Sequence, residues 1–220
     1  MTKPRVPETH STISGRAYAE AYDRMQAALR EQGWLETGDI LLSGSVSGCA
    51  LEVGSGPGFL GLEWLLQTSA TRLVGLDISP DMVAIARNHT RELGLADRAE
   101  HLLGSAEALP FDDNAFDTVF TSRSLHEWLS PAAIFTGLWR VLKPGGNLYV
   151  SDLRRDLSRS ACNFLDQRVN SDVIRETLRA SIAAAYTRAE LKALLNTVQL
   201  VGCEVVETPF GLRVSGIKPV

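Results

Sequence analysis

The sequence is poor in cysteine, and its three cysteines are too far apart to form a recognisable pair. Cys49, Cys162 and Cys203 show no C-x-x-C spacing, so we expect neither a disulfide framework nor a bound metal. Long apolar runs are also lacking, because none approaches the ~20 residues of a membrane span. The polar N-terminus lacks the apolar core of a secretory signal. These absences favour a cytoplasmic protein without a membrane span.

A surplus of basic charge is missing as well. The chain has 22 Lys and Arg against 26 Asp and Glu, which gives a net charge of −4 at pH 7. Proteins that bind nucleic acid need basic side chains to displace the counterions of the phosphates, so we expect no nucleic-acid partner. The length of 220 residues and the 45% hydrophobic content suit one α/β domain with a buried core. Both a monomer and a homodimer are compatible with this composition.

The most informative segment is residues 51–58, which read Leu-Glu-Val-Gly-Ser-Gly-Pro-Gly. An apolar strand here breaks into a turn in which every second residue is glycine. Glycine lets the backbone turn tightly and approach a ligand closely. Pro57 suits the first turn of a following helix, where its missing N–H is not needed. A strand, a glycine-rich loop and a helix in this order form the nucleotide-binding corner of a doubly wound α/β sheet.

The residues around this loop indicate which nucleotide it binds. Phe59 stands where a dinucleotide fingerprint needs a third small residue, and no Gly-Lys-Ser/Thr ending marks a phosphate loop. Asp77 ends the next apolar run, where an acidic side chain can accept hydrogen bonds from ribose hydroxyls. A ribose without phosphates to neutralise points to S-adenosylmethionine.

Four segments together resemble the class I S-adenosylmethionine-dependent methyltransferases, in the type 11 subgroup similar to the ubiquinone/menaquinone C-methyltransferases. They are residues 51–58, 73–87, 104–122 and 142–152, which follow the order of the family. The resemblance covers roughly residues 48–152. It implies S-adenosylmethionine as cofactor, S-adenosylhomocysteine as product and a small-molecule acceptor. It does not identify the acceptor or the atom that receives the methyl group.

Apolar periodicity and this resemblance together predict the fold. We expect a Rossmann-like, doubly wound sheet of seven mostly parallel strands with one antiparallel strand, in a three-layer α/β/α sandwich. Strands are expected at 49–53, 72–77, 99–103, 116–121, 146–151, 200–206 and 210–217. Helices are expected at 14–32, 57–68, 80–93 and 131–142.

The whole chain, residues 1–220, is expected to form a single methyltransferase domain. Residues 1–13 are expected to be flexible, and residues 14–47 to form a helical lid over the cofactor. Residues 153–198 are expected to add two or three helices beside the acceptor site.

The resemblance assigns roles to the glycine loop and to the strand before it. The backbone N–H groups of Gly54–Gly58 should face the methionine carboxylate of the cofactor. Glu52 should either order the loop or reach the methionine amine through water. Tyr22 belongs to a segment that resembles the lid of the family; alternatively, Tyr18 and Tyr22 only anchor their helix to the sheet.

Other cofactor contacts are expected at the ends of the second and third strands. Asp77 should bind the ribose hydroxyls, and Ile78 should pack on the adenine. Met82 should either do the same or fill the core. The expected cofactor-binding residues are Tyr22, Glu52, Gly54, Ser55, Gly56, Gly58, Asp77, Ile78, Met82, Ser105, Ala106, Glu107 and Ser122.

One position departs from the family. Members commonly have Gly-Asp-Ala after the third strand, where the Asp accepts a hydrogen bond from the adenine amino group, but this chain has Gly104-Ser105-Ala106. A neutral hydroxyl makes the weaker hydrogen bond, about 0.5–1.5 against 1.5–3 kcal/mol. We therefore expect weaker adenine recognition unless Glu107 substitutes or the N–H of Ala106 carries the contact.

Catalytic residues are expected in the loop after the fourth strand, at 121–128. His126 is a candidate for general base or acceptor contact, because histidine titrates near neutrality, or it is a structural residue. Arg123 either binds an acceptor carboxylate or pairs with Glu127. The implied mechanism is in-line displacement at the sulfonium methyl group, for which no metal is required.

Two other functions are compatible with the same glycine loop. A regulatory or partner protein could bind S-adenosylmethionine without transferring the methyl group. A nicotinamide-dependent oxidoreductase is disfavoured by Phe59 and by the four matching segments.

Overall fold

The computed structural model describes residues 3–8, 15–44, 46–68, 72–169, 171–198 and 200–220. These residues contain a seven-stranded sheet with the strand order β3-β2-β1-β4-β5-β7-β6. The strands are β1 (Cys49–Val53), β2 (Arg72–Asp77), β3 (Ala99–Leu103), β4 (Phe116–Ser122), β5 (Leu142–Leu153), β6 (Glu204–Glu207) and β7 (Gly211–Ile217). Strands β1 to β5 pair in parallel, and β7 runs antiparallel to both of its neighbours. This confirms the predicted doubly wound sheet with one antiparallel strand.

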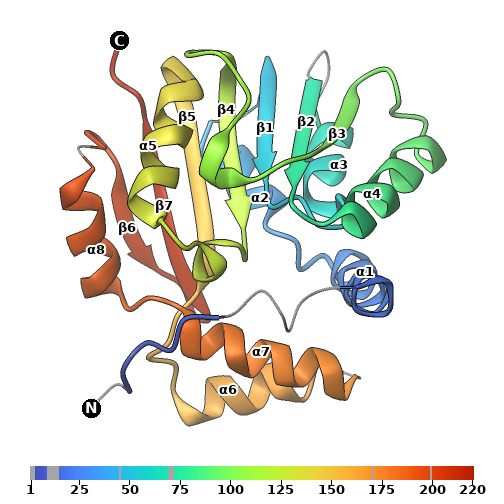
Figure 1. Cartoon of the computed structure of the whole chain (residues 1–220), viewed down its shortest axis with the longest axis vertical. Coiled ribbons are helices and arrows are strands. Elements are labelled where there is room, and N and C mark those ends of the chain that lie inside the picture. The colour runs from blue at the N-terminus through green and yellow to red at the C-terminus, as the bar shows by residue number, and fades with distance from the viewer. Residues whose placement is uncertain (1–2, 9–14, 45, 69–71, 170, 199) are drawn as a thin grey trace.

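Helices cover both faces of the sheet, which completes the predicted three layers (Figure 1). The helices of these two layers are α2 (Thr37–Leu42), α3 (Phe59–Leu66), α4 (Pro80–Glu92), α5 (Pro131–Val141) and α8 (Arg188–Thr197). One core cluster joins the sheet to α5 and α8, and a second joins it to α2 and α3. Because Trp64 and Phe120 of the second cluster are fully buried against each other, that face is firmly packed.

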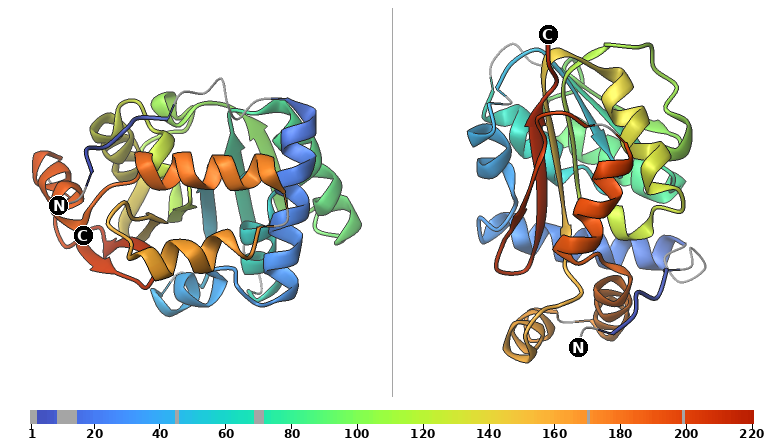
Figure 2. Two further views of the ribbon diagram at one scale, coloured as in Figure 1. Left: turned by 90° about the horizontal axis from the view of Figure 1, so that it is seen from below. Right: turned by 90° about the vertical axis from the view of Figure 1, so that its left-hand side faces the viewer.

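Three further helices lie across the carboxyl ends of the parallel strands, as the view from below shows (Figure 2). They are α1 (Arg16–Glu31), α6 (Arg159–Asp166) and α7 (Asp172–Ala184). Two short 3-10 turns, η2 (Ala106–Ala108) and η3 (Leu125–Glu127), follow β3 and β4 at the same edge. Tyr18 of α1, Met82 of α4 and Ile174 of α7 share one buried cluster. The helices over the strand ends are therefore packed onto the body of the domain.

Strand and helix boundaries follow the sequence predictions closely, with three differences. Strand β6 begins at Glu204, four residues later than predicted. Strand β5 begins at Leu142, directly after α5, because a bulge between Phe116 and Thr118 lets β4 pair with this earlier stretch. Residues 153–198 contain α6, α7 and α8, but α8 packs on the sheet rather than over the strand ends.

Residues 3–8 differ from the expectation of a flexible start, whereas residues 1–2 and 9–13 of that prediction lie outside the described residues. The N–H of Val6 donates to the carbonyl of Ala183, and the carbonyl of Lys3 accepts from Arg155. Glu8 is only 7% exposed. This segment therefore runs along α7 and places a buried carboxylate at the edge of the sheet where ligands bind in α/β folds.

Candidate functional site

A cleft of about 610 Å³ opens at the carboxyl ends of β1, β2 and β4. Its size lies within the usual range for small-molecule sites, roughly 300–1,000 Å³. Most of the expected cofactor residues line it: Tyr22, Gly54, Gly56, Asp77, Ile78, Met82, Ser105, Ala106, Glu107 and Ser122. The structure therefore brings together residues that are up to 100 positions apart in the sequence. We call this cavity the cofactor cleft.

Asp77 lies at the end of β2 with both carboxylate oxygens on backbone donors. Oδ2 accepts from the N–H of Gly56 at 2.7 Å, and Oδ1 accepts from the N–H of Ser79 at 2.8 Å. Burial raises the pKa of Asp77, and these two N–H groups oppose the rise. Each oxygen keeps a lone pair, so the side chain can still accept two ribose hydroxyls.

The N–H groups of the glycine loop are hydrogen-bonded within the chain, and their predicted contact with the methionine carboxylate stays a prediction. The N–H groups of Gly54 and Ser55 both donate to the carbonyl of Leu76, and that of Gly58 donates to the carbonyl of Ser55. Gly56 donates to Asp77, as described above. Tight turning at positive φ folds the loop back on itself and on β2, so its donors are occupied.

Gly58 lines neither the cofactor cleft nor the smaller cavity beside it, so its contact with the cofactor stays a prediction. It precedes α3 at a φ of 85°, and a Cβ there would lie 3.1 Å from atoms of Ala86 and His101. Gly58 is therefore required for close packing of the loop on α4 and β3.

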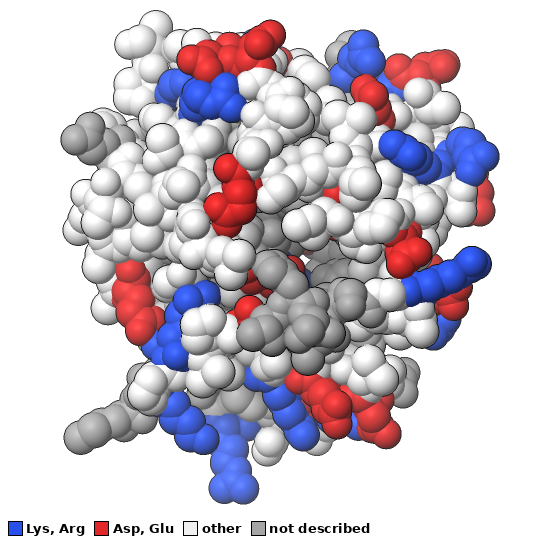
Figure 3. All heavy atoms as spheres, viewed as in Figure 1, with Lys and Arg blue, Asp and Glu red and all other residues white. Residues whose placement is uncertain are grey.

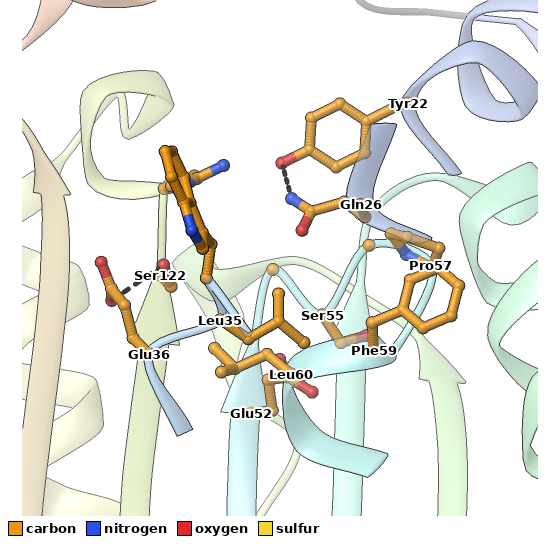
Figure 4. Close-up of a pocket in the computed structure, with 14 residues that line it drawn as sticks. Tyr22, Gln26, Leu35, Glu36, Glu52, Ser55, Pro57, Phe59, Leu60 and Ser122 are labelled. Carbon is orange, nitrogen blue, oxygen red and sulfur yellow. Dashed lines mark hydrogen bonds between the residues drawn. The ribbon is translucent and has the colours of Figure 1, made fainter. Parts of the chain in front are cut away.

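A smaller cavity beside the loop holds Glu52 and Ser55, as Figure 4 shows. Within the described part of the chain, Glu52 Oε2 and Ser55 Oγ are buried without a hydrogen-bond partner. Burial raises the pKa of Glu52 well above its ordinary value, with the charge of Asp77 adding to the effect. Two buried polar atoms without partners favour a polar ligand group at this position.

The opposite wall of this smaller cavity is polar and already hydrogen-bonded. Tyr22 accepts from Gln26 at 2.9 Å, and Ser122 donates to Glu36 at 3.2 Å (Figure 4). Tyr22 lies against Tyr18 with its ring centroid 5.9 Å away. Helix α1 thus places Tyr22 next to Gly56 of the loop, with Tyr18 beside it.

The cofactor cleft has one exposed and one buried apolar side chain beyond the end of β2. Ile78 is 61% exposed. Met82 is 7% exposed and packs with Tyr18 of α1. Met82 therefore belongs to the core and to the wall of the cleft at once.

Ser105 follows β3 at the position where family members commonly have an aspartate. The hydroxyl of Ser105 accepts from the N–H of Glu107 at 3.2 Å and so begins η2. Glu107 in turn accepts from the N–H of Ser130 at 3.0 Å. Both side chains line the cleft, but each already serves the turn that carries it.

A further cavity, of about 310 Å³, lies between α1, β5, α6 and α7. Its walls are largely apolar, with Met25, Leu165, Val169, Ile174, Leu178 and Phe210 among them. Trp34, Phe164 and Phe210 stack at one end, with ring centroids 6.0 and 5.1 Å apart, and Arg168 lies over two of these rings. We call it the acceptor-side cavity.

His126 lies on the floor of the acceptor-side cavity among three carboxylates. Its Nδ1 is 2.8 Å from Asp152 Oδ1, and its Nε2 is 3.4 Å from Glu8 and 3.7 Å from Glu127. Burial lowers the pKa of His126, but the carboxylates outweigh it, the charge of Asp152 foremost, and raise it to about 9. The imidazole is thus positively charged at neutral pH.

Arg123 lines both of these cavities at a φ of 57°. The predicted ion pair with Glu127 is not formed, and the described residues offer the Arg123 guanidinium no hydrogen bond or ion pair. A non-glycine residue at positive φ is uncommon and is often found at binding sites.

Sequence reasoning missed several residues of this site. Glu8, Glu36, Trp34 and Phe210 come from segments without a motif, and only the fold brings them to the strand ends. Glu127 was treated only as a partner of Arg123. Its position next to His126, at the end of a parallel strand, was the one signal available.

Two kinds of feature are absent from the described residues. No helix there has the length and apolar character that crossing a membrane requires. No group of three or more histidine, cysteine, aspartate or glutamate side chains is placed to hold a metal ion.

The doubly wound sheet, the glycine loop and the acidic end of β2 define a nucleotide-binding protein of the Rossmann-like class. Residues 51–150 match the family described as "Methyltransferase domain". Over these residues the chain is therefore similar to the class I S-adenosylmethionine-dependent methyltransferases, whose cofactor is S-adenosylmethionine.

Curated relatives and solved structures agree with this assignment. The chain is 32% identical to erythromycin 3''-O-methyltransferase of Saccharopolyspora erythraea, over 61% of this chain and 41% of that relative. It is 27% identical to a ubiquinone/menaquinone biosynthesis C-methyltransferase of Psychromonas ingrahamii, over 74% of this chain and 70% of the relative. The chain thus spans less than half of the first relative.

A solved structure from Methanococcus maripaludis, assigned as an S-adenosyl-L-methionine-dependent methyltransferase, has the same fold. It superposes with a TM-score of 0.74 at 19% identity, covering 99% of this chain and 98% of that one. At this identity the likeness concerns the fold alone.

Proposed function

We propose that the protein transfers the methyl group of S-adenosylmethionine to a small molecule held in the acceptor-side cavity. One observation carries this proposal: the cofactor cleft and the acceptor-side cavity meet, because Tyr18, Tyr22, Arg123 and Glu127 line both. A donor and an acceptor bound on the two sides would face each other across these four residues.

In this proposal the cofactor is held from both ends of its cleft. Asp77 accepts the ribose hydroxyls, and Ile78 and Met82 contact the adenine. Glu52 Oε2 and Ser55 Oγ, which are buried without a partner in the described structure, face the methionine part through polar contacts. The remaining contacts come from Tyr22, Gly54, Gly56, Ser105, Ala106, Glu107 and Ser122.

The cofactor supplies a methyl group that its sulfonium charge already activates. The residues of the chain then have to align the acceptor, exclude water and take up a proton, and alignment alone supplies several kcal/mol. Apolar side chains of α1, α6 and α7 would keep water out of the acceptor-side cavity. Arg123 and His126 are proposed to contact the acceptor, since both line this cavity.

The acceptor is proposed to be a largely apolar small molecule, in keeping with the walls of its cavity. The two named relatives are an O-methyltransferase and a C-methyltransferase, so the methylated atom is open to both types.

Acidic and basic side chains are interspersed over the face in Figure 3, which supports the proposal that no nucleic acid binds. We propose a cytoplasmic monomer or homodimer, since the three cysteines are free thiols.

Calorimetric titration with S-adenosylhomocysteine, followed by incubation with methyl-labelled S-adenosylmethionine and a panel of acceptors, tests this function. We expect micromolar binding and label transfer to at least one acceptor. Binding without formation of S-adenosylhomocysteine from any acceptor would favour the alternative, a non-catalytic protein that binds the cofactor. Absence of binding would contradict both.

A further inference from the structure

The boundary between the two cavities limits which residues can act on the acceptor proton. Only four side chains line both cavities among the residues that the structure describes, namely Tyr18, Tyr22, Arg123 and Glu127. A group that removes a proton from the acceptor while the methyl group arrives has to reach this boundary, because proton transfer needs hydrogen-bond distance.

Three of these four side chains are poor proton acceptors. Burial raises the pKa of Tyr18 and of Tyr22, so both phenols keep their protons at neutral pH. The guanidinium of Arg123 stays protonated in proteins. Among these four, only the carboxylate of Glu127 can act as a base. Glu36, which lines the acceptor-side cavity and the smaller cavity, already accepts hydrogen bonds from the hydroxyls of Ser122 and Ser151.

His126, the sequence-based candidate for this role, has both ring nitrogens engaged. Asp152 binds Nδ1 at 2.8 Å, and Glu8 and Glu127 lie 3.4 and 3.7 Å from Nε2. The His126 side chain is 4% exposed, whereas that of Glu127 is 32% exposed. A charged, enclosed imidazolium cannot accept a proton, but it can orient a neighbouring carboxylate.

The surroundings of Glu127 suit proton transfer. Burial raises the pKa of Glu127 to about 7, the charge of His126 lowers it, and Glu8, Asp152 and Asp77 add to the rise. Arg123, Tyr18 and Tyr22 are the other titratable groups at the same boundary. A base is most effective when its pKa lies near the working pH.

We propose that Glu127 is the general base of the methyl transfer, and that His126, held by Asp152 and Glu8, is a positioning residue. This rests on the proposed function. The acceptor atom forms its bond to the methyl carbon, the carbon–sulfur bond breaks with its electron pair left on sulfur, and the acceptor proton passes to the Glu127 carboxylate. The acceptor is then a hydroxyl, thiol or protonated-amine compound that carries its proton at neutral pH.

A titration without any acceptor tests the proposal first. The side-chain carboxyl carbon of Glu127, assigned by its loss in E127Q, should titrate in ¹³C NMR with a midpoint near 7. E8Q should move this midpoint down, because a neighbouring negative charge is removed. H126Q should move it up, because the neighbouring positive charge is removed. A midpoint near the ordinary glutamate value of about 4.3, or no shift in either variant, would overturn the proposal.

Probe acceptors with and without a proton test it a second time. A phenol, an alkylamine and an alkanethiol carry a proton, whereas iodide carries none. E127Q should lower methyl transfer to the proton-bearing probes at least about 100-fold but leave transfer to iodide within about threefold. E100Q, the same change at an exposed residue of β3, is the matched control. Equal losses for both kinds of probe would contradict a base.

These outcomes separate the two proposals. A wild-type protein that binds S-adenosylhomocysteine but methylates no probe contradicts the proposed function. An active wild-type protein with an equally active E127Q variant contradicts only the role of Glu127.

Discussion

The cofactor cleft and the acceptor-side cavity differ in how their walls are built. The cleft is formed mainly by strand ends and the turns that follow them, and most of these residues lie within 51–150, the part of the chain that matches the family. The acceptor-side cavity draws on α1, α6, α7 and the turn before β7, most of which lie outside that part.

This difference explains why the chain reveals its cofactor more readily than its acceptor. In the cleft, the backbone fixes the position of each polar group, as the two N–H bonds to Asp77 show. In the acceptor-side cavity, side chains from separate helices determine the shape. Relatives can therefore share a cofactor site while they differ in acceptor.

The largest expected effect is a loss of cofactor affinity that leaves the acceptor-side cavity unchanged. Asp77→Ala removes two charge-assisted hydrogen bonds to the ribose, each worth about 1.5–3 kcal/mol, so affinity for S-adenosylhomocysteine should fall roughly 100-fold or more. Calorimetry measures this loss, with Asp97→Ala, an exposed aspartate after α4, as the control. A loss of less than about tenfold would show that the ribose is bound elsewhere.

The charged groups around His126 in the acceptor-side cavity should make the free energy of unfolding depend on pH. The pKa of His126 is raised from 6.5 to about 9 in the folded protein. Its stabilising effect is therefore complete below pH 6.5 and is lost as the pH rises through 9, a loss of roughly 3 kcal/mol. Urea unfolding between pH 6.5 and 9.5 should show this decline in E127Q and not in H126Q/E127Q, two proteins in which residue 127 cannot titrate. Parallel curves for the two proteins would mean that the imidazole is neutral.

A third change tests whether the helices over the strand ends belong to the same core as the sheet. Ile174→Ala removes a side chain that is 3% exposed between α7, α1 and α4, which should lower the free energy of unfolding by about 2 kcal/mol. This lies at the low end for such changes, because the adjoining cavity lets α7 adjust. Val173→Ala, next in the chain and 54% exposed, is the control. Equal free energies of unfolding for the two variants would show that α7 does not share a core with the rest of the domain.

The smallest expected effect concerns the position that departs from the family. Ser105→Asp can keep the cap on the N–H of Glu107 and place a charged acceptor at the cofactor cleft. Cofactor affinity should rise about fivefold, which corresponds to about 1 kcal/mol. Unchanged or weaker binding in calorimetry would show that residue 105 does not contact the adenine.

The sequence predicted the sheet well because its strands alternate with helices at regular spacing, and most strand boundaries agree within a few residues. It also located Asp77 and the glycine loop, since both follow from a local pattern. It did not predict that the N–H groups of Gly54 and Ser55 donate to the carbonyl of Leu76, because this pairing depends on the neighbouring strand.

Glu8 and Glu127 show the limit of such reasoning. Glu8 lies 118 positions before His126 in the sequence and contacts it because residues 3–8 pack along α7. No apolar periodicity in the sequence predicts this packing. Glu127 lies one residue from His126. Only the structure shows that Glu127 lines both cavities, whereas His126 lines the acceptor-side cavity alone.

A crystal structure of the protein with S-adenosylhomocysteine would test the central claim most directly. We predict the ribose hydroxyls on Asp77 and the sulfur facing the boundary formed by Tyr18, Tyr22, Arg123 and Glu127. A sulfur that faces solvent, or a cofactor that lies in the acceptor-side cavity, would contradict the account.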